Sequence, residues 1–169
     1  YRTVDLVGHD WASQQLEGLT SLLGERPDLA DRTADEYGVS DESLPFVLHG
    51  SAGQAIEARA HYIDTPQLEG IAYLTVFRQD VYPFAASDFW YTFQGLSLDG
   101  AWYVAADFVI EADMFPAKVR QKDARRMDSA KRWARSVKQS GETLNGAAPV
   151  AFTPPLTSID ALVESITFE

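Results

Sequence analysis

The 169-residue chain contains no cysteine, which excludes disulfide bonds, thiolate metal sites and a cysteine nucleophile. It has only three histidines, His9, His49 and His61, and no two of them stand at the spacing of metal ligands on a helix. No glycine-rich phosphate loop is present. No apolar run reaches the ~20 residues that cross a bilayer. We therefore expect no metal, no cofactor and no transmembrane segment.

Basic side chains are also scarce, since 14 Lys and Arg stand against 25 Asp and Glu, for a net charge of −11. This balance argues against nucleic acid as the main partner. Nine of the basic residues lie between Lys118 and Lys138, so that segment carries +7 and the remainder of the chain −18. Two hypotheses follow. The basic segment lies against the acidic sheet of its own domain, or it docks an acidic partner or an anionic surface.

The length and the 46% hydrophobic content are those of one globular domain, which we place at residues 1–169. Alternating and helical apolar patterns predict strands at 1–7, 56–62, 71–79, 89–96 and 101–110, and helices at 10–23, 116–139 and from 157. Asp99-Gly100 is a strong two-residue hairpin signal, and Thr157 with Asp160 resembles a capping box. The predicted fold class is α+β, an antiparallel meander sheet of about five or six strands flanked by helices, mainly on one face.

The segment Gly8-His9-Asp10-Trp11-Ala12 follows a predicted short strand. It resembles the nucleophile elbow of α/β-hydrolases that use aspartate, such as epoxide hydrolases and haloalkane dehalogenases. In such an enzyme Asp10 would be the nucleophile. That fold requires several strands before the elbow, joined by helical crossovers, whereas only seven residues precede Gly8 here. The alternative is that Asp10 caps the first helix.

Polar residues within or beside the apolar strands are the candidate binding residues on the sheet: Arg78, Gln79, Tyr91, Gln94 and Tyr103. A polar side chain in an apolar strand must find a hydrogen-bond partner or face water. One interpretation is that the two glutamines tie down a neighbouring loop. The other is that they form a polar patch among aromatic rings, as in a small ligand groove.

Several short motifs carry a family resemblance: Leu44-Pro45-Phe46, Ala52-Gly53-Gln54, Gly70-Ile71-Ala72-Tyr73-Leu74-Thr75, Tyr91-Thr92-Phe93-Gln94-Gly95-Leu96-Ser97 with Asp99-Gly100, and Tyr103-Val104. As a set they are similar to an uncharacterised family of exported or lipid-anchored bacterial envelope proteins of unknown function. The resemblance covers roughly Leu16 to Ile110. It implies export and supplies no activity. Family members often have Arg where this chain has Ala72, so a ligand held by that Arg is not expected here.

A weaker likeness is to the PsbP-like fold, in which a terminal helix leads into a Ser-Ile-x-Phe strand. Ser165-Ile166-Thr167-Phe168 matches that ending. The chain begins at Tyr1 instead of Met, so we expect a processed or trimmed form.

These observations favour a non-enzymatic cell-envelope or extracellular domain that binds an acidic protein partner, another envelope component or a small ligand. The contact would lie on the sheet residues named above, exposed to solvent, or on the basic helix around Arg125 and Arg132. A hydrolase that uses Asp10 and a purely structural subunit of an envelope assembly remain as alternatives. A large exposed apolar patch would favour the structural subunit.

Overall fold

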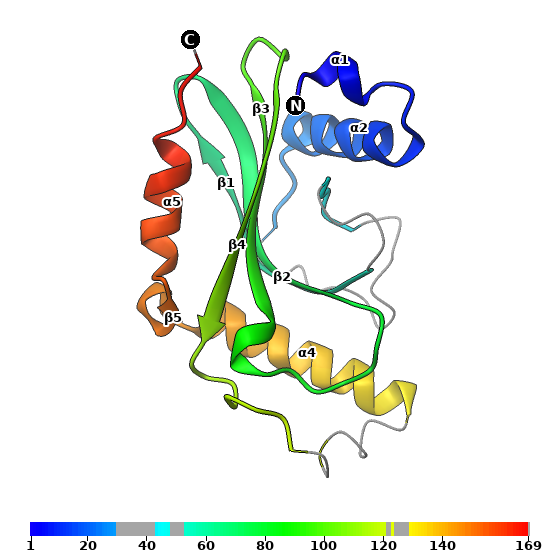
Figure 1. Cartoon of the computed structure of the whole chain (residues 1–169), viewed down its shortest axis with the longest axis vertical. Coiled ribbons are helices and arrows are strands. Elements are labelled where there is room, and N and C mark those ends of the chain that lie inside the picture. Colours follow the sequence, from blue (N-terminus) through cyan, green and yellow to red (C-terminus); the bar gives the residue numbers. More distant parts are fainter. Residues whose placement is uncertain (30–42, 48–52, 121–122, 124–128, 169) are drawn as a thin grey trace.

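The computed structural model describes residues 1–29, 43–47, 53–120, 123 and 129–168 (Figure 1). It confirms the predicted fold class, an α+β domain built on a five-stranded antiparallel sheet of order β1-β2-β3-β4-β5. The strands are β1 (Gly53–Asp64), β2 (Leu68–Arg78), β3 (Phe89–Ser97), β4 (Tyr103–Ala112) and β5 (Phe152–Thr153). The helices named below are α1 (Thr3–Leu6), α2 (Asp10–Glu25), α4 (Ala130–Gly146) and α5 (Leu156–Glu164).

The first four strands form a meander because each pairs antiparallel with the next along the chain, as the sequence predicts. Between β3 and β4 the chain turns at Asp99-Gly100, and Gly100 adopts φ +69°, a conformation that costs glycine little. The Ser97 hydroxyl donates a hydrogen bond of 2.5 Å to Asp99, and Ala101 N donates one of 3.0 Å to the same carboxylate. The turn therefore holds the two strands in the register that pairs Leu96 with Tyr103.

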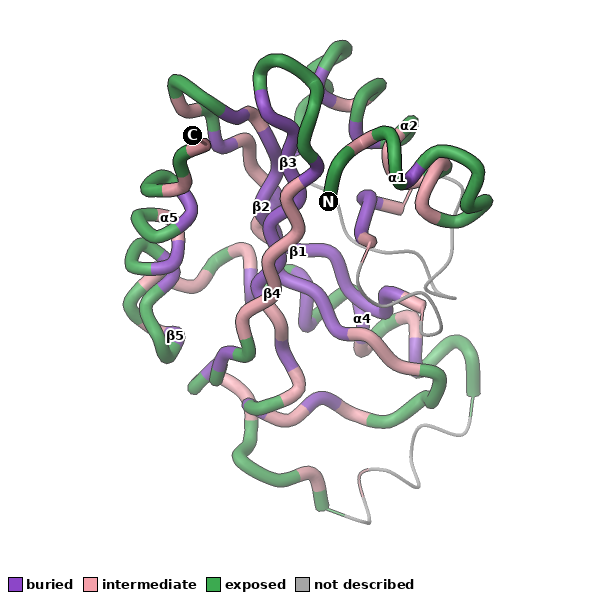
Figure 2. The backbone as a smooth tube through the Cα atoms, turned by 45° about the horizontal axis from the view of Figure 1, so that its top comes forward, coloured by how far each residue is buried: buried purple, intermediate pink, exposed green. Residues whose placement is uncertain are grey.

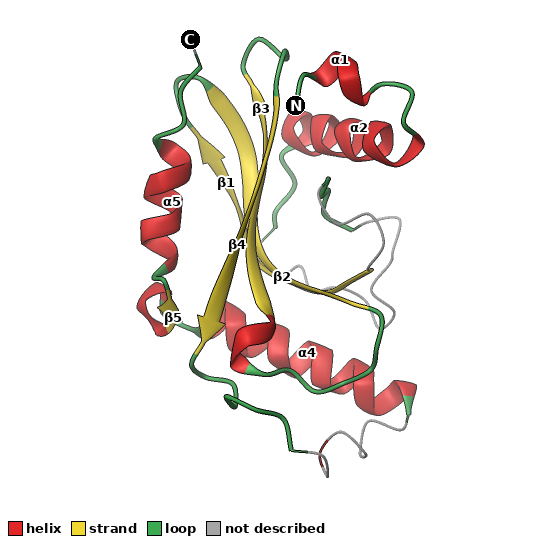
Figure 3. Ribbon diagram, viewed as in Figure 1, coloured by secondary structure: helices red, strands yellow, loops and turns green. Residues whose placement is uncertain are grey.

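Helices cover both faces of the sheet, whereas the sequence suggested that most would pack on one (Figure 3). In β2, Ala72 and Leu74 belong to the core shared with α4 and α5, while Ile71 and Tyr73 belong to the core shared with α2. Alternate residues of a strand point to opposite faces, so β2 is buried on both sides, as expected for a central strand. Figure 2 shows this buried backbone passing through β2 and β3.

The basic helix begins and ends later than the predicted range 116–139. Residues 116–120 contain no helix, and α4 starts after Ser129, whose side chain accepts a hydrogen bond from Arg132 N. The helix then continues to Gly146 because its buried positions extend past the predicted end to Gly141 and Leu144. A small residue such as Gly141 lets the helix approach the sheet closely, so its helix-breaking tendency is overridden by packing.

The chain termini differ from prediction at three points. The expected strand at 1–7 is a short helix, α1, and only Arg2 pairs with the sheet, at Trp102. The capping box at the start of α5 does not form, because the helix begins at Leu156 and has no side-chain cap. The residues after α5, up to Phe168, form no strand. Of the helices that the structure describes, none has the length and apolarity needed to cross a bilayer.

Candidate functional sites on the sheet and its helices

The predicted sheet patch is not assembled as one exposed surface, so this expectation was wrong. Tyr91, Gln94 and Tyr103 are all fully buried. Tyr91 lies in the core beneath α4 and α5, whereas Tyr103 lies in the core beneath α2. Gln94 bonds to Tyr103 on the α2 side. The pleat of β3 sends odd and even positions to opposite faces, so Tyr91 and Gln94 cannot contact one ligand on a single face.

Gln94 instead fastens a neighbouring segment, as one interpretation of the sequence predicts. Its Oε1 accepts hydrogen bonds from the Tyr103 hydroxyl at 2.9 Å and from Val47 N at 3.3 Å. Glu57 in β1 accepts from Leu44 N at 2.8 Å, and the Tyr73 hydroxyl donates to Pro45 O at 3.0 Å. Side chains from three strands thus satisfy the backbone of residues 44–47, which crosses the sheet without being part of it.

The Arg78 side chain is bound by neighbouring residues of its own chain. Its Nη2 lies 2.8 Å from Asp88 Oδ2, its Nη1 donates to Tyr82 O at 2.5 Å, and its guanidinium lies 4.8 Å from the centre of the Phe84 ring. These contacts shape the connection between β2 and β3. Gln79 follows in that connection and is exposed.

The outer side of α4 carries four residues of the basic segment, whereas Lys118 and Arg120 precede the helix. Lys131, Arg132, Arg135 and Lys138 are exposed, while Trp133 and Val137 are buried on the opposite side of the helix. The hypothesis that the basic segment lies against its own sheet holds for the helix itself, which packs on β1 through Trp133 and Val137. Its four basic side chains are exposed on the opposite side and point away from the sheet. Arg125 lies outside the described residues.

Asp10 lacks the surroundings that the hydrolase hypothesis requires. It is the first residue of α2, with His9 in the N-cap position, and its side chain is exposed. A helix precedes it where the elbow needs a strand. It is the acidic residue of the first helical turn, where a negative charge interacts favourably with the helix dipole. The prediction that Asp10 is the N-cap residue is wrong, because His9 occupies that position and Asp10 follows it.

Tyr91, which the sequence named as a candidate, belongs to a cluster of titratable groups that joins β1, β3 and α5. The Tyr91 hydroxyl donates a short hydrogen bond to Asp160. His61 Nε2 lies 3.7 Å from Asp160 Oδ1, and His61 Nδ1 lies 2.9 Å from Arg59 O. Arg59, His61, Asn145 and Asp160 line an open cleft of about 370 Å³. Strands and helices that are distant in sequence bring these residues together. No sequence motif could therefore have revealed the cluster.

Contact between His61 and Asp160 stabilises the charged forms of both side chains. The hydrogen bond with Asp160 raises the pKa of His61 above its usual 6.5, although burial opposes the shift. Burial acts to raise the pKa of Asp160, but hydrogen bonds from His61 and Tyr91 outweigh it and hold that pKa below 3.8. Burial, followed by the contact with Asp160, raises the pKa of Tyr91, which therefore stays a neutral donor.

Arg59 anchors the same region through its backbone and its side chain. It adopts φ +54°, unusual for a residue with a side chain, at a point where β1 and β2 lose regular register. Its N–H donates to Asn145 Oδ1 at 2.6 Å, and its Nη1 donates to Ala147 O at 2.5 Å and to Leu144 O at 3.3 Å. The guanidinium thus satisfies carbonyls at the C-terminal end of α4.

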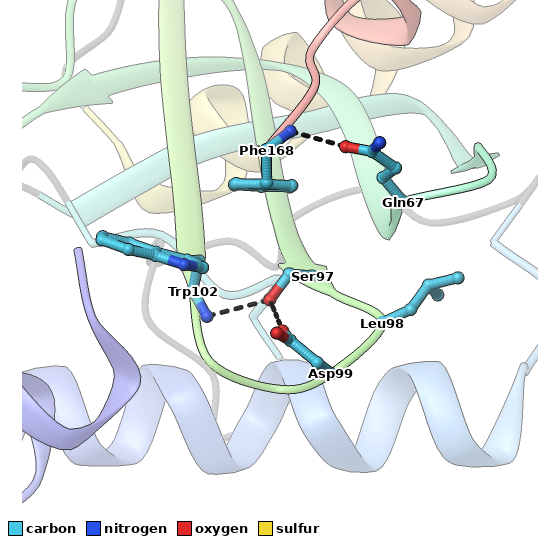
Figure 4. A pocket seen from close by; sticks show the side chains of 6 residues that line it. All are labelled: Gln67, Ser97, Leu98, Asp99, Trp102 and Phe168. Carbon is cyan, nitrogen blue, oxygen red and sulfur yellow. Dashed lines mark hydrogen bonds between the residues drawn. The ribbon is translucent and has the colours of Figure 1, made fainter.

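A second cavity, of about 310 Å³, lies at the far end of the sheet (Figure 4). Ser97, Leu98, Asp99 and Trp102 line it from the β3–β4 hairpin, Gln67 from the turn before β2, and Phe168 from the segment after α5. Gln67 Oε1 accepts a hydrogen bond of 2.5 Å from Phe168 N, so the C-terminal segment is fastened to this end of the sheet. The sequence predicts the turn at Asp99-Gly100 but not the cavity beside it.

Comparison with known proteins adds no assignment, since no family model, curated protein or solved structure matches the chain. Within the described residues, no three His, Asp or Glu side chains converge as metal ligands would.

Proposed function

We propose that this chain is a non-enzymatic binding domain of the cell envelope or the exterior, and that it docks an acidic protein partner through the outer face of α4. The observation that carries this proposal is the sorting of charge on α4. Lys131, Arg132, Arg135 and Lys138 occupy the side of the helix opposite its buried residues. We call these four residues the basic face.

Helical geometry places the basic face on one continuous surface. Lys131, Arg135 and Lys138 stand at positions i, i+4 and i+7, which lie above one another on an α-helix. Trp133 and Val137 hold the other side against the sheet, so the direction of the basic face is fixed by the core. No acidic residue occurs between Ala130 and Gly141. The helix therefore presents charge of one sign to solvent as far as Gly141, before the exposed Glu142.

The rest of the chain makes the field of these charges directional. The chain outside residues 118–138 carries a net charge of −18. An acidic partner is therefore repelled by most of the domain and attracted by the basic face. Such asymmetry selects orientation and accelerates association more than it adds affinity. The expected partner is a protein surface rich in Asp and Glu that is large enough to span two helical turns.

Fluorescent poly-L-glutamate is a suitable probe, with binding measured by anisotropy at low ionic strength. Replacing Lys131, Arg135 and Lys138 together by Gln should weaken binding by at least about threefold, because each exposed ion pair contributes ~0.2–1 kcal/mol. Binding should also fall at high salt. These residues are exposed, so the variant should fold normally, which circular dichroism would check.

The matched control carries the same change in net charge on another helix. Gln14→Glu, Thr20→Glu and Ser21→Glu alter exposed positions of α2 and should leave binding within about twofold of the unchanged protein, since distant exposed charges are screened. Equal loss of binding in both triple variants would show that net charge alone controls the interaction, and the proposal would fail.

The proposed location has separate support in the resemblance of residues Leu16 to Ile110 to exported envelope proteins. A signal peptide or lipobox encoded upstream of Tyr1 would support export. Detection of the protein only in the cytoplasmic fraction of its cells would contradict it.

A further inference from the structure

We propose that the cavity at the β3–β4 hairpin binds a small organic ammonium cation, held between the Trp102 ring and the Asp99 carboxylate. This site is independent of the basic face, because none of its six lining residues belongs to α4.

The aromatic surface comes from Trp102 and Phe168. The Trp102 side chain is 42% exposed although it follows a tight turn at the end of the sheet. Tryptophan presents the most favourable ring face for a cation, and quaternary ammonium groups are recognised in this way. Leu98, which is 59% exposed, adds an apolar wall suited to the carbon substituents of such a cation. Solvent can reach all of these surfaces through the open mouth of the cavity.

The charge of the cavity is negative. Among the described residues that line it, Asp99 is the only charged one. Hydrogen bonds from the Ser97 hydroxyl and from Ala101 N lower the pKa of Asp99, so the carboxylate is ionised at neutral pH. An anionic ligand would be repelled. Arg2 pairs with Trp102 through the backbone but does not line the cavity.

The Asp99 carboxylate and the backbone that carries the two rings are held in place before a ligand arrives. Asp99 is held by the two turn hydrogen bonds, and Trp102 N donates to the Ser97 hydroxyl at 2.9 Å. Phe168 is fastened by its hydrogen bond to Gln67, and Figure 4 shows both ring-bearing segments meeting at the hairpin. Binding therefore has to order the two rings but not the turn or the carboxylate, which limits its entropic cost.

The size of the cavity limits the ligand. A volume of about 310 Å³ is near the lower end of the ~300–1,000 Å³ typical of ligand pockets. This space suits a compact cation such as choline and excludes a folded peptide. The excess of acidic residues in the chain also raises the local concentration of cations around it.

Choline and its neutral carbon isostere, 3,3-dimethylbutan-1-ol, provide the test, because the two differ mainly in charge. Titration of the 169-residue chain would be followed by the indole N–H signal of Trp102 in NMR spectra. We expect choline to shift this signal saturably and to bind at least about threefold more tightly than the isostere, with the difference decreasing at high salt.

Two substitutions localise the site. Asp99→Asn keeps an acceptor for Ser97 and Ala101 N but removes the charge, and should weaken choline binding by about two- to fivefold. Trp102→Ala should weaken it by a similar factor, followed through the backbone amide of Leu98. Asp113→Asn and Trp11→Phe, both at exposed positions elsewhere, are the controls and should change nothing.

The proposal is overturned if choline does not bind at concentrations of tens of millimolar, or if the neutral isostere binds as tightly. It is also overturned if glucose saturates the site while choline does not, since a sugar requires no charge. Unchanged choline binding by Asp99→Asn would exclude the carboxylate. Failure of poly-L-glutamate binding at α4 would leave this result unaffected.

Discussion

Replacing Gly95 by alanine should destabilise the domain through a clash inside the sheet. Gly95 pairs directly with Gly70 across β2 and β3, and the Phe93 ring lies over both. A Cβ at Gly95 would stand 2.5 Å from Phe93 Cζ and 3.0 Å from Glu69 O. Phe93 is completely buried and would meet a Cβ at Gly70 at 2.6 Å as well. The ring therefore has little freedom to move aside.

The expected cost is near the upper end of the ~1–3 kcal/mol typical of overpacked cores. A loss of about 2–3 kcal/mol would lower the melting temperature by about 4–12 °C in a domain of this size. Urea denaturation followed by circular dichroism measures the free energy of unfolding. A second variant, Gly95→Ala with Phe93→Leu, should lose less than the sum of the two single changes, because the smaller side chain leaves room for the new Cβ.

Gly18→Ala is the matched control, since it makes the same chemical change in an open position of α2. No atom lies within 4 Å of a Cβ built at Gly18, and alanine is favoured over glycine in a helix by ~0.8–1.0 kcal/mol. The same substitution should thus stabilise the protein at Gly18 and destabilise it at Gly95. If Gly95→Ala unfolds at the same urea concentration as the unchanged protein, the proposed clash does not exist.

Two further predictions concern the cluster on β1. Arg59→Gly should be less destabilising than Arg59→Ala in urea titrations, because both lose the side-chain hydrogen bonds at the end of α4 but only glycine accepts φ +54° without strain; the reverse order would refute a strained backbone at this position. For His61, a raised pKa means stabilisation that is present below the usual value of 6.5 and is lost as the pH rises through the folded value. Asp160, whose pKa is lowered, loses its contribution as the pH falls below 3.8. His61→Gln should therefore cost most stability near pH 5 and progressively less above neutrality, and a cost that is constant with pH would refute the ion pair.

The central sheet could be predicted because its signals are local. Alternation of apolar residues locates β1 to β4, and Asp99-Gly100 specifies the hairpin between the last two. The role of Gln94 was also accessible, because a buried amide needs partners and a nearby segment is the usual source. The two ends of α4 were predicted at the wrong residues. A single serine such as Ser129 is a weak signal for a helix N-cap, and Gly141 suggests a helix end although packing against the sheet continues the helix past it.

The hairpin cavity and the His61–Asp160 cluster could not be predicted because their residues meet only after folding. Phe168 and Gln67 are separated by 101 positions, and His61 and Asp160 lie in the first strand and the last helix. The expectation of an exposed patch at Tyr91 and Gln94 failed for another reason. A strand alternates its faces, and in this sheet helices cover both, so polar residues within a central strand are buried.

The register break at Arg59 has a consequence for how the molecule behaves among its own copies. β1 is the outermost strand on one side of the sheet, and such borders can recruit strands of other molecules into growing aggregates. Here the backbone N–H of Arg59 is already committed to Asn145, and the kinked strand offers a poor template for a straight neighbour. The irregular backbone at Arg59 thus helps to prevent this edge strand from pairing with strands of other molecules, while the buried face of β1 stays intact.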